Sequence, residues 1–134
     1  GSAAYKSGVY ATALRIWTPL AEQGYAGAQY NLGQMYRLGQ GVPQDYKTAV
    51  KWYKLAAEQG FADAQFNLGV MYGMGMGVTK DYVYALRWWN IAASSGNKNA
   101  VKNRDIVAKL MTPVQIADAQ KLARECVRKK YKGC

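Results

Sequence analysis

Residues 28–33 read Ala-Gln-Tyr-Asn-Leu-Gly, and the chain continues with Met35-Tyr36, Gly39, Gly41-Val42, Asp45-Tyr46, Ala49, Trp52 and Ala56-Ala57. Thirty-six positions later the same residue types return, from Ala64-Gln65-Phe66-Asn67-Leu68-Gly69 through Met71-Tyr72, Gly75, Gly77-Val78, Asp81-Tyr82, Ala85 and Trp88 to Ala92-Ala93. Self-similarity at one fixed period is the sequence signature of a repeat protein, in which each unit packs on its neighbours. The fold is therefore predicted to be an array of similar units.

Each unit has the pattern of two helices joined by a turn. Apolar residues within 30–36 combine three- and four-residue spacings, as one face of a helix does. Residues 38–44 contain two glycines and a proline, which end that helix and turn the chain. Asp45 then supplies an N-cap oxygen, and residues 49–57 resume the helical spacing until Gly60. The sequence therefore predicts one helix pair per unit.

Glycines and tryptophans recur at fixed places in these helices. Gly33 and Gly69 stand in mid-helix, where glycine costs about 1 kcal/mol relative to alanine, so a neighbouring helix is expected to approach closely there. A second recurrent group is expected to pack in the core rather than form a stacking platform, because its members follow the helical spacing and the repeat: Trp17, Trp52, Trp88 and Trp89.

The repeat also marks the parts of the chain. Residues 21–24 match residues 57–60, so the chain opens on half a unit, whereas Arg104 and Asp105 replace the expected leucine and glycine. We expect a tag remnant at 1–2, an N-terminal partial repeat at 3–27, repeats at 28–63 and 64–99, and C-terminal capping helices with a tail at 100–134.

The last part contains a further helix start. Thr112-Pro113-Val114-Gln115 combines an N-cap threonine, a proline at the first helical position and a capping-box glutamine. The helix that begins there is expected to cover the end of the stack, as solenoids require. Its predicted apolar stripe consists of Val114, Ile116, Ala117, Ala119, Leu122, Ala123 and Cys126.

Positive charge gathers near the C-terminal end. The chain carries 18 Lys and Arg against 8 Asp and Glu, a net charge of +10. Residues 98–134 hold ten of the basic and three of the acidic side chains, and so carry +7 of that total. An electrostatic partner is therefore expected near this end and is expected to be acidic.

The composition argues against catalysis by common routes. The chain contains no histidine, so the commonest general base and the commonest metal ligand are both missing. No catalytic residue, metal site or cofactor is predicted. No run of about 18 apolar residues occurs, and a membrane span is not expected.

The repeated unit resembles the Sel-one-like repeat, a longer-looped relative of the tetratricopeptide repeat, over about residues 9–100. The resemblance implies an all-α fold, a right-handed superhelix of helix pairs with a C-terminal capping helix. It also implies a bacterial adaptor or scaffold that binds a protein or peptide and is not an enzyme. Many bacterial members are exported, so a periplasmic or secreted location is expected, with the cytoplasm as the alternative.

The resemblance also selects a binding groove, because the first helix of each pair lines the concave surface of tetratricopeptide-like solenoids. The groove residues that it implies are Gln34, Arg37, Leu38, Val70, Met74, Lys102, Ile106 and Lys109. Tyr30 and Phe66 belong either to this groove or to the core. An apolar groove with basic residues at its C-terminal side suits an extended peptide or a helix with acidic flanks.

Cys126 and Cys134 are eight residues apart. Cysteine-rich secreted members of the resembled family carry pairs with similar spacing, so the resemblance implies a disulfide that holds the C-terminal tail in an oxidising compartment. Two unpaired thiols in a reducing cell are the alternative. The spacing is too wide for a Cys-x-x-Cys redox motif, and further ligands for zinc are missing.

Two alternative functions remain. Some cysteine-rich relatives bind penicillin and hydrolyse it weakly, and Ser95 and Lys98 form one Ser-x-x-Lys sequence, but the companion motifs of the β-lactamases are absent. The basic C-terminal helix is a candidate for anionic ligands such as nucleic acid. However, Tyr131 is the only aromatic residue among its charges and no nucleic-acid motif occurs. Protein or peptide binding is the favoured hypothesis.

Overall fold

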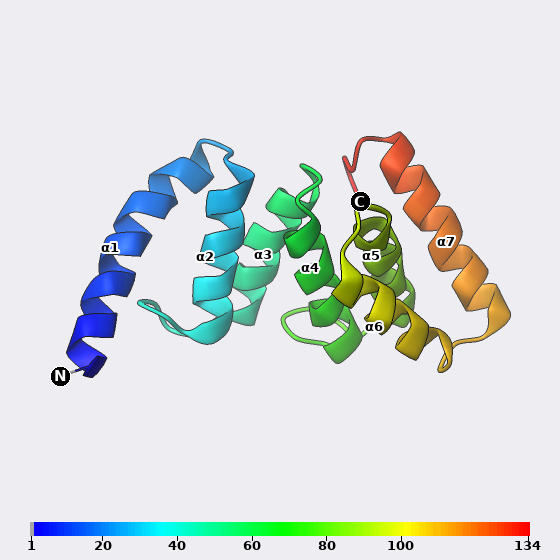
Figure 1. The fold of residues 1–134 in the computed structure, drawn as a ribbon, viewed down its shortest axis with the longest axis horizontal. Coiled ribbons are helices and arrows are strands. Elements are labelled where there is room, and N and C mark those ends of the chain that lie inside the picture. The colour runs from blue at the N-terminus through cyan, green and yellow to red at the C-terminus, as the bar shows by residue number, and fades with distance from the viewer. Residues whose placement is uncertain (1) are drawn as a thin grey trace.

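The computed structural model describes residues 2–134, and the side chains from Ser7 onward. These residues form seven helices and no strand, which confirms the predicted all-α class. The helices are α1 (Ser2–Glu22), α2 (Ala26–Leu38), α3 (Tyr46–Ala57), α4 (Ala62–Met74), α5 (Tyr82–Ser94), α6 (Lys98–Ala108) and α7 (Pro113–Arg128). Figure 1 shows them following one another in a row from α1 to α7, as in a solenoid.

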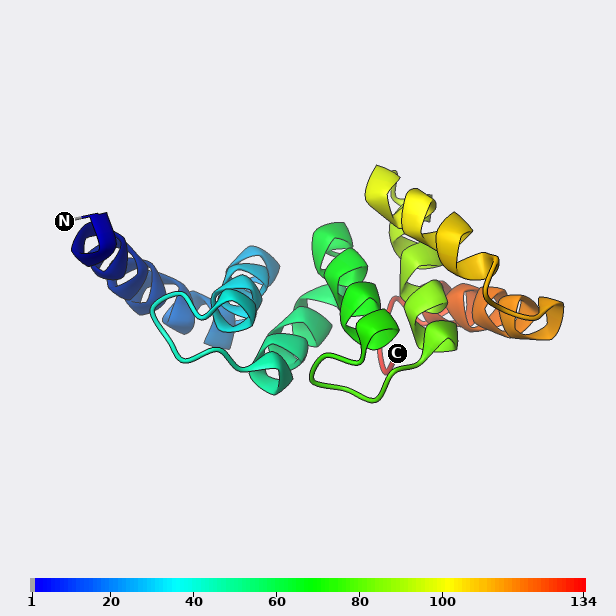
Figure 2. The same ribbon diagram turned by 90° about the horizontal axis from the view of Figure 1, so that it is seen from below.

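Most helices pack on their neighbours in sequence, and the two predicted units appear as the pairs α2 with α3 and α4 with α5. Seen from below, the row of helices remains extended from the N-terminus to α7 (Figure 2). Buried side chains form three clusters along this row, rather than one central core. Each unit therefore depends on the adjacent units for the burial of its apolar face.

The predicted helix caps are present. The Asp45 carboxylate accepts a hydrogen bond from the Thr48 amide at 3.2 Å, and the Asp81 carboxylate accepts one from the Val83 amide at 2.9 Å. Gly39 follows α2 in a left-handed conformation with φ 67°, which glycine adopts without steric cost. These local signals explain why the loops between paired helices lie where the sequence predicts them.

The mid-helix glycines lie against aromatic rings of the following helix, as predicted. A Cβ added at Gly33 would lie 2.6 Å from Cδ1 and Cε1 of Tyr53, and one added at Gly69 would lie 2.4 Å from Nε1 of Trp89. Tyr53 has no exposed surface and Trp89 is 4% exposed. Only a glycine at these positions lets the two helices of a pair come so close.

The tryptophan prediction is confirmed for two residues and needs correction for the others. Trp88 and Trp89 are buried, whereas Trp17 and Trp52 are half-buried and pack at the margin of the N-terminal cluster. Trp17 belongs to α1, which packs substantially on α2 alone, and Trp52 belongs to α3, which packs on α2 and α4. Trp88 and Trp89 belong to α5, which packs on α4, α6 and α7, so more neighbouring helices cover these two rings.

The N-terminal half unit is a single long helix. In α1, Val9 stands 36 positions before the N-cap Asp45, and a valine side chain has no oxygen to cap a helix. The helix accordingly runs through this point and begins at Ser2. Ile16 of α1 occupies the repeat position of Trp52 and Trp88 and remains 53% exposed. Gly1 of the expected tag remnant lies outside the described residues.

The C-terminal helices differ in part from the prediction. The Thr112 hydroxyl accepts from the Gln115 amide at 3.2 Å and the Gln115 side chain accepts from the Thr112 amide at 2.9 Å, so the capping box forms. However, α7 packs on α5 and makes little contact with α6. Val114 is 69% exposed and Ala117 is also exposed, so the predicted stripe was wrong at these two residues.

The tail after α7 folds back on the earlier helices. A disulfide joins Cys126 and Cys134, whose Cα atoms are 5.8 Å apart. The ring of Tyr131 lies beside Gly60, where an added Cβ would be 3.0 Å from Cε2 of that ring. Arg87 of α5 donates a hydrogen bond to the carbonyl oxygen of Cys134. The disulfide therefore closes a tail that covers the junction of α3, α4 and α5, and Figure 1 shows the chain end beside α5.

Replacement of Gly69 by alanine is expected to lower the free energy of unfolding by about 1–3 kcal/mol, because the Cβ would overlap the Trp89 ring. Gly27→Ala is the matched control, since no heavy atom lies within 4 Å of a Cβ added there. That substitution is expected to be neutral or to stabilise by up to about 1 kcal/mol. Urea unfolding followed by circular dichroism measures both changes. Equal effects would contradict the close contact.

Loss of the disulfide is expected to lower the free energy of unfolding by about 2–3 kcal/mol, because the bond restricts a short loop in the unfolded chain. The urea midpoint of the wild type is measured with and without a reductant. A double variant, Cys126→Ala with Cys134→Ala, serves as the control, since a reductant should not change its midpoint. If reduction leaves the wild-type midpoint unchanged, the tail contributes no stability through this bond.

Candidate functional site

Two adjacent hollows run along α2, α4 and α6. The first has a volume of about 410 Å³ and is lined by Arg37, Phe66, Asn67, Val70, Met71, Met74 and Met76. The second has a volume of about 250 Å³ and is lined by Val70, Gly73, Met74, Tyr82, Trp89, Asn103, Ile106 and Val107. Val70 and Met74 line both hollows, so the two lie next to each other, and together we call them the α4 groove.

The structure brings together half of the residues predicted for the groove. Arg37, Phe66, Val70 and Met74 line the first hollow, and Ile106 lines the second. Gln34 lines neither hollow but is hydrogen-bonded to Arg37. Its side chain therefore supports the wall of the groove.

The remaining predicted residues lie elsewhere. Leu38, Lys102 and Lys109 are exposed and line neither hollow. The half-buried Tyr30 ring packs 5.3 Å from the ring of Phe61, between centroids, and 6.0 Å from that of Tyr53. Its surroundings are those of a packing residue.

Several lining residues were missed by the sequence reasoning, above all Asn67 and Asn103. Both occupy the same repeat position as Asn31. The recurrence of a polar residue inside an otherwise apolar helix could have identified them as candidate site residues from the sequence. Trp89 and Tyr82 were missed for another reason, because they come from α5, whereas the resemblance pointed to the first helix of each pair.

A polar cluster lies beside the first hollow. The Gln34 side-chain oxygen accepts hydrogen bonds from Nε of Arg37 at 3.2 Å, from Nη2 of Arg37 at 3.0 Å and from Nδ2 of Asn67 at 3.1 Å. The Tyr53 hydroxyl also donates to this oxygen. Nε of Arg37 lies 3.0 Å from the Tyr53 hydroxyl oxygen, which accepts a further bond. Four donor atoms from three helices therefore converge on one acceptor.

Burial raises the pKa of Tyr53 above its ordinary value, although the hydrogen bond and the charge of Arg37 partly oppose this effect. A raised pKa favours the neutral phenol, so the hydroxyl keeps its proton at neutral pH and remains a donor. The pKa of Tyr30 is raised by burial as well, and the neighbouring Asp63 acts in the same direction. Both phenols near the cluster are therefore uncharged, and the positive charge of the cluster comes from Arg37.

The second hollow lies at the repeat position equivalent to the first, but the side chains at the equivalent positions are chemically different. Adding 36 to Gln34, Arg37, Tyr53 and Asn67 gives Val70, Gly73, Trp89 and Asn103, and all four line the second hollow. The Trp89 indole donates to the Phe66 carbonyl at 3.1 Å, whereas its counterpart Tyr53 donates to a side chain. The first hollow therefore has a cation in its lining, whereas the second has no charged lining residue and keeps the polar side chains of Asn103 and Tyr82.

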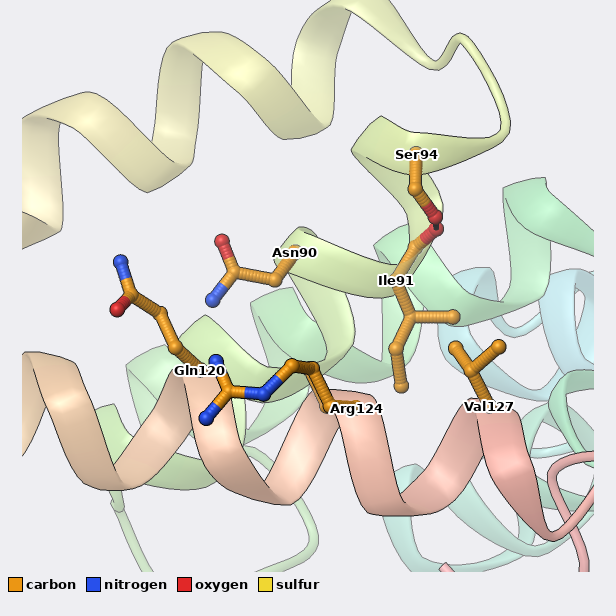
Figure 3. A pocket seen from close by; sticks show the side chains of 7 residues that line it. Asn90, Ile91, Ser94, Gln120, Arg124 and Val127 are labelled. Atoms are coloured by element: carbon orange, nitrogen blue, oxygen red, sulfur yellow. Dashed lines mark hydrogen bonds between the residues drawn. The ribbon is translucent and has the colours of Figure 1, made fainter.

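A separate hollow of about 420 Å³ lies between α5 and α7, and the sequence did not predict it. It is lined by Asn90, Ile91, Ser94, Gln120, Ala123, Arg124 and Val127. Figure 3 shows the side chains of Asn90, Gln120 and Arg124 on one side of the space between α5 and α7, and those of the apolar Ile91 and Val127 on the other. This space exists because α7 packs on α5 and diverges from α6.

Basic side chains cover the outer face of α7. Lys121, Arg124 and Arg128 surround a small hollow there together with Glu125. In the part of the chain that the structure describes, the one ion pair joins Arg104 and Asp105 at 3.3 Å. The positive charge of α7 is therefore not neutralised by close carboxylates from the described side chains.

The residues of the hydrolase alternative lie outside these sites. Ser95 is the C-cap residue that follows α5, and both Ser95 and Lys98 are exposed and line none of the hollows above. Among the described residues, no group of three or more acidic, cysteine or histidine side chains is placed to hold a metal ion. Nor does any described helix have the length and apolar character needed to cross a membrane.

The solved structures that are similar to this chain include the following two. The first is c5321, described as a protective antigen present in uropathogenic Escherichia coli strains and displaying an SLR fold. It is 30% identical, with a TM-score of 0.83, and the match covers 98% of this chain but 32% of the antigen. The second is a Sel1 repeat protein from Oxalobacter formigenes, 42% identical with a TM-score of 0.67 over 69% of each chain. This chain spans about a third of the antigen's length.

The family comparison agrees with these structures. No curated protein sequence matches the chain. The family model of the Sel1 repeat matches residues 26–61 and 62–97, two windows that are also 36 residues apart. Because these windows together cover more than half of the chain, this protein belongs to the Sel1 repeat family.

Proposed function

We propose that this protein is a non-catalytic recognition module that binds a peptide or protein segment in the α4 groove. Sel1 repeat proteins generally mediate protein–protein interactions. The observation that carries the proposal is the groove itself: two hollows at equivalent repeat positions lie side by side and share Val70 and Met74 as lining residues. Two neighbouring hollows, of which only the first has a cation in its lining, can orient a bound segment as well as hold it.

The exposed apolar side chains in the groove support this proposal. Met74 is 68% exposed and Ile106 is 52% exposed, although both stand beside hollows that could take them out of water. Methionine is flexible and polarisable, so Met74 and Met76 can adapt their shape to a ligand, whereas Met71 is fully buried in the core beneath them. Burial of this surface under a partner would provide the hydrophobic part of the binding energy.

The proposed location is the bacterial periplasm or the cell exterior, where the protein would act as an adaptor. The support for this location is the Cys126–Cys134 disulfide, because disulfides persist in oxidising compartments and are rare in the cytosol. Both cysteines of the chain are engaged in this bond.

The groove is tested with peptides selected from a random displayed library on the immobilised protein. Their dissociation constants are then measured by fluorescence anisotropy for the wild type and for a Met74→Glu, Ile106→Glu variant. Affinity is expected to fall about tenfold or more, because a bound ligand would desolvate the new carboxylates. Both side chains are exposed, so the fold should tolerate the change.

A Val9→Glu, Leu55→Glu variant is the matched control, because it adds the same charge at exposed apolar residues that line none of the hollows described. Its affinity is expected to stay within about twofold of the wild type. Peptides that bind all three proteins equally would show that the α4 groove is not the binding surface.

The basic face of α7 is proposed to accelerate the association of acidic partners, since long-range attraction acts mainly on the association rate. The probe is a selected peptide that carries acidic flanks. Its association rate should fall when Lys121, Arg124 and Arg128 are changed to glutamine, and should fall for the wild type when ionic strength is raised from about 0.05 M to about 0.3 M. A matched variant removes the same charge from α3 at Lys47, Lys51 and Lys54. Equal slowing by the two variants would indicate an effect of net charge alone.

A further inference from the structure

The polar cluster beside the first hollow has more donors than acceptors. The Gln34 amide oxygen has two lone pairs, yet donors from Arg37, Tyr53 and Asn67 all point to it. In the described part of the chain, no carboxylate lies within ion-pair distance of Arg37. Its guanidinium is half-buried and bonded only to neutral oxygens. The cluster is therefore better suited to an anionic acceptor than to the single neutral one that it holds.

The cluster opens on an apolar space. Arg37 and Asn67 line the first hollow directly, and its other walls are Phe66, Val70 and three methionines. A ligand group at the polar edge of this hollow would therefore have apolar surface next to it. The volume of about 410 Å³ leaves room for one large side chain as well as a small charged group.

We propose that the first hollow binds the C-terminal residue of a partner polypeptide, with the terminal carboxylate at Arg37 and Asn67 and an apolar side chain among the methionines. This inference rests on the proposed function and names the ligand group of the same groove. A carboxylate has about four acceptor positions and can accept two parallel bonds from a guanidinium, which one amide oxygen cannot match.

A chain terminus fits this hollow better than an internal acidic side chain does. In an apolar C-terminal residue, the carboxylate and the side chain leave the same Cα, so both groups reach the walls of one hollow. An internal aspartate or glutamate would fill the space beside Arg37 with its own stem and leave the methionine walls to another residue. The chemistry of the second hollow agrees, since Gly73 stands there in place of Arg37 and no second cation lines it to compete for the carboxylate.

The test follows the side-chain N–H resonances of Arg37 and Asn67 by NMR while three small probes are added. N-acetyl-leucine carries a terminal carboxylate and an apolar side chain, N-acetyl-leucinamide lacks the carboxylate, and N-acetyl-glutamic acid α-amide carries it on the side chain. N-acetyl-leucine is expected to shift both resonances in a saturable manner, with a dissociation constant of ~1–10 mM for so small a ligand. The other two probes are expected to cause at most about a tenth of its shift at equal concentration.

Substitutions in the polar cluster test whether the resonance shifts arise from binding at Arg37 and Asn67. Arg37→Met is expected to abolish the saturable shift at Asn67, and Asn67→Asp is expected to abolish it at Arg37 because the new carboxylate occupies the guanidinium. Lys51→Met removes the same charge from an exposed site on α3 and should leave both shifts unchanged. Circular dichroism establishes that each variant is folded before it is titrated.

Three results would overturn the inference. Equal shifts with N-acetyl-leucine and its amide would mean that the hollow binds apolar groups without a carboxylate, and the proposed peptide-binding function would still stand. Equal or stronger shifts with the glutamic acid amide would mean that the hollow binds an internal acidic residue rather than a chain terminus. Absence of any saturable shift with N-acetyl-leucine would also overturn the inference. The proposed function would then be judged separately, by the peptide selection and the Met74→Glu, Ile106→Glu variant.

Discussion

The groove depends on one close contact between helices, in which a glycine of the first helix lies against an aromatic ring of the second. Gly33 leaves room for Tyr53 in one unit, and Gly69 leaves room for Trp89 in the next. The contact does more than tighten the packing. Because the Tyr53 ring lies against Gly33, its hydroxyl reaches the side-chain oxygen of the next residue, Gln34, in the polar cluster. A structural requirement of the repeat therefore also positions a side chain of the proposed binding site.

Recognition in this protein is attributed to the places where the two units differ rather than to the places where they agree. The repeated residues form the helices, caps and core. At the groove, however, Arg37 is followed 36 residues later by Gly73, and Gln34 by Val70. The two substitutions remove the cation and the amide acceptor from the second site, while the helices α2 and α4 keep the same length and the same left-handed glycine at their C-terminal end. A solenoid can in this way present a sequence of different subsites on one regular scaffold.

Local signals in the sequence predicted much of the fold, because caps and helical periodicity act over a few residues. Asp45 and Thr112 cap the helices that they were expected to cap. The packing of α7 could not be predicted in the same way, since amphipathicity indicates that a helix buries one face but not against which helix. Val114 is exposed because of the way in which α7 packs on α5. Asn67 escaped notice because its role arises from convergence with α2 and α3, which only the folded chain shows.

The most direct test of this account is the effect of Gly33→Ala on the side-chain amide resonances of Gln34 and Asn67. A Cβ at Gly33 would push the Tyr53 ring aside, so its hydroxyl should leave the Gln34 oxygen. Both side-chain resonances are then expected to move clearly in the folded variant, whereas Gly27→Ala should leave them in place. If Gly33→Ala proves less stable but both resonances keep their wild-type positions, the glycine contact serves packing alone and does not position the binding cluster.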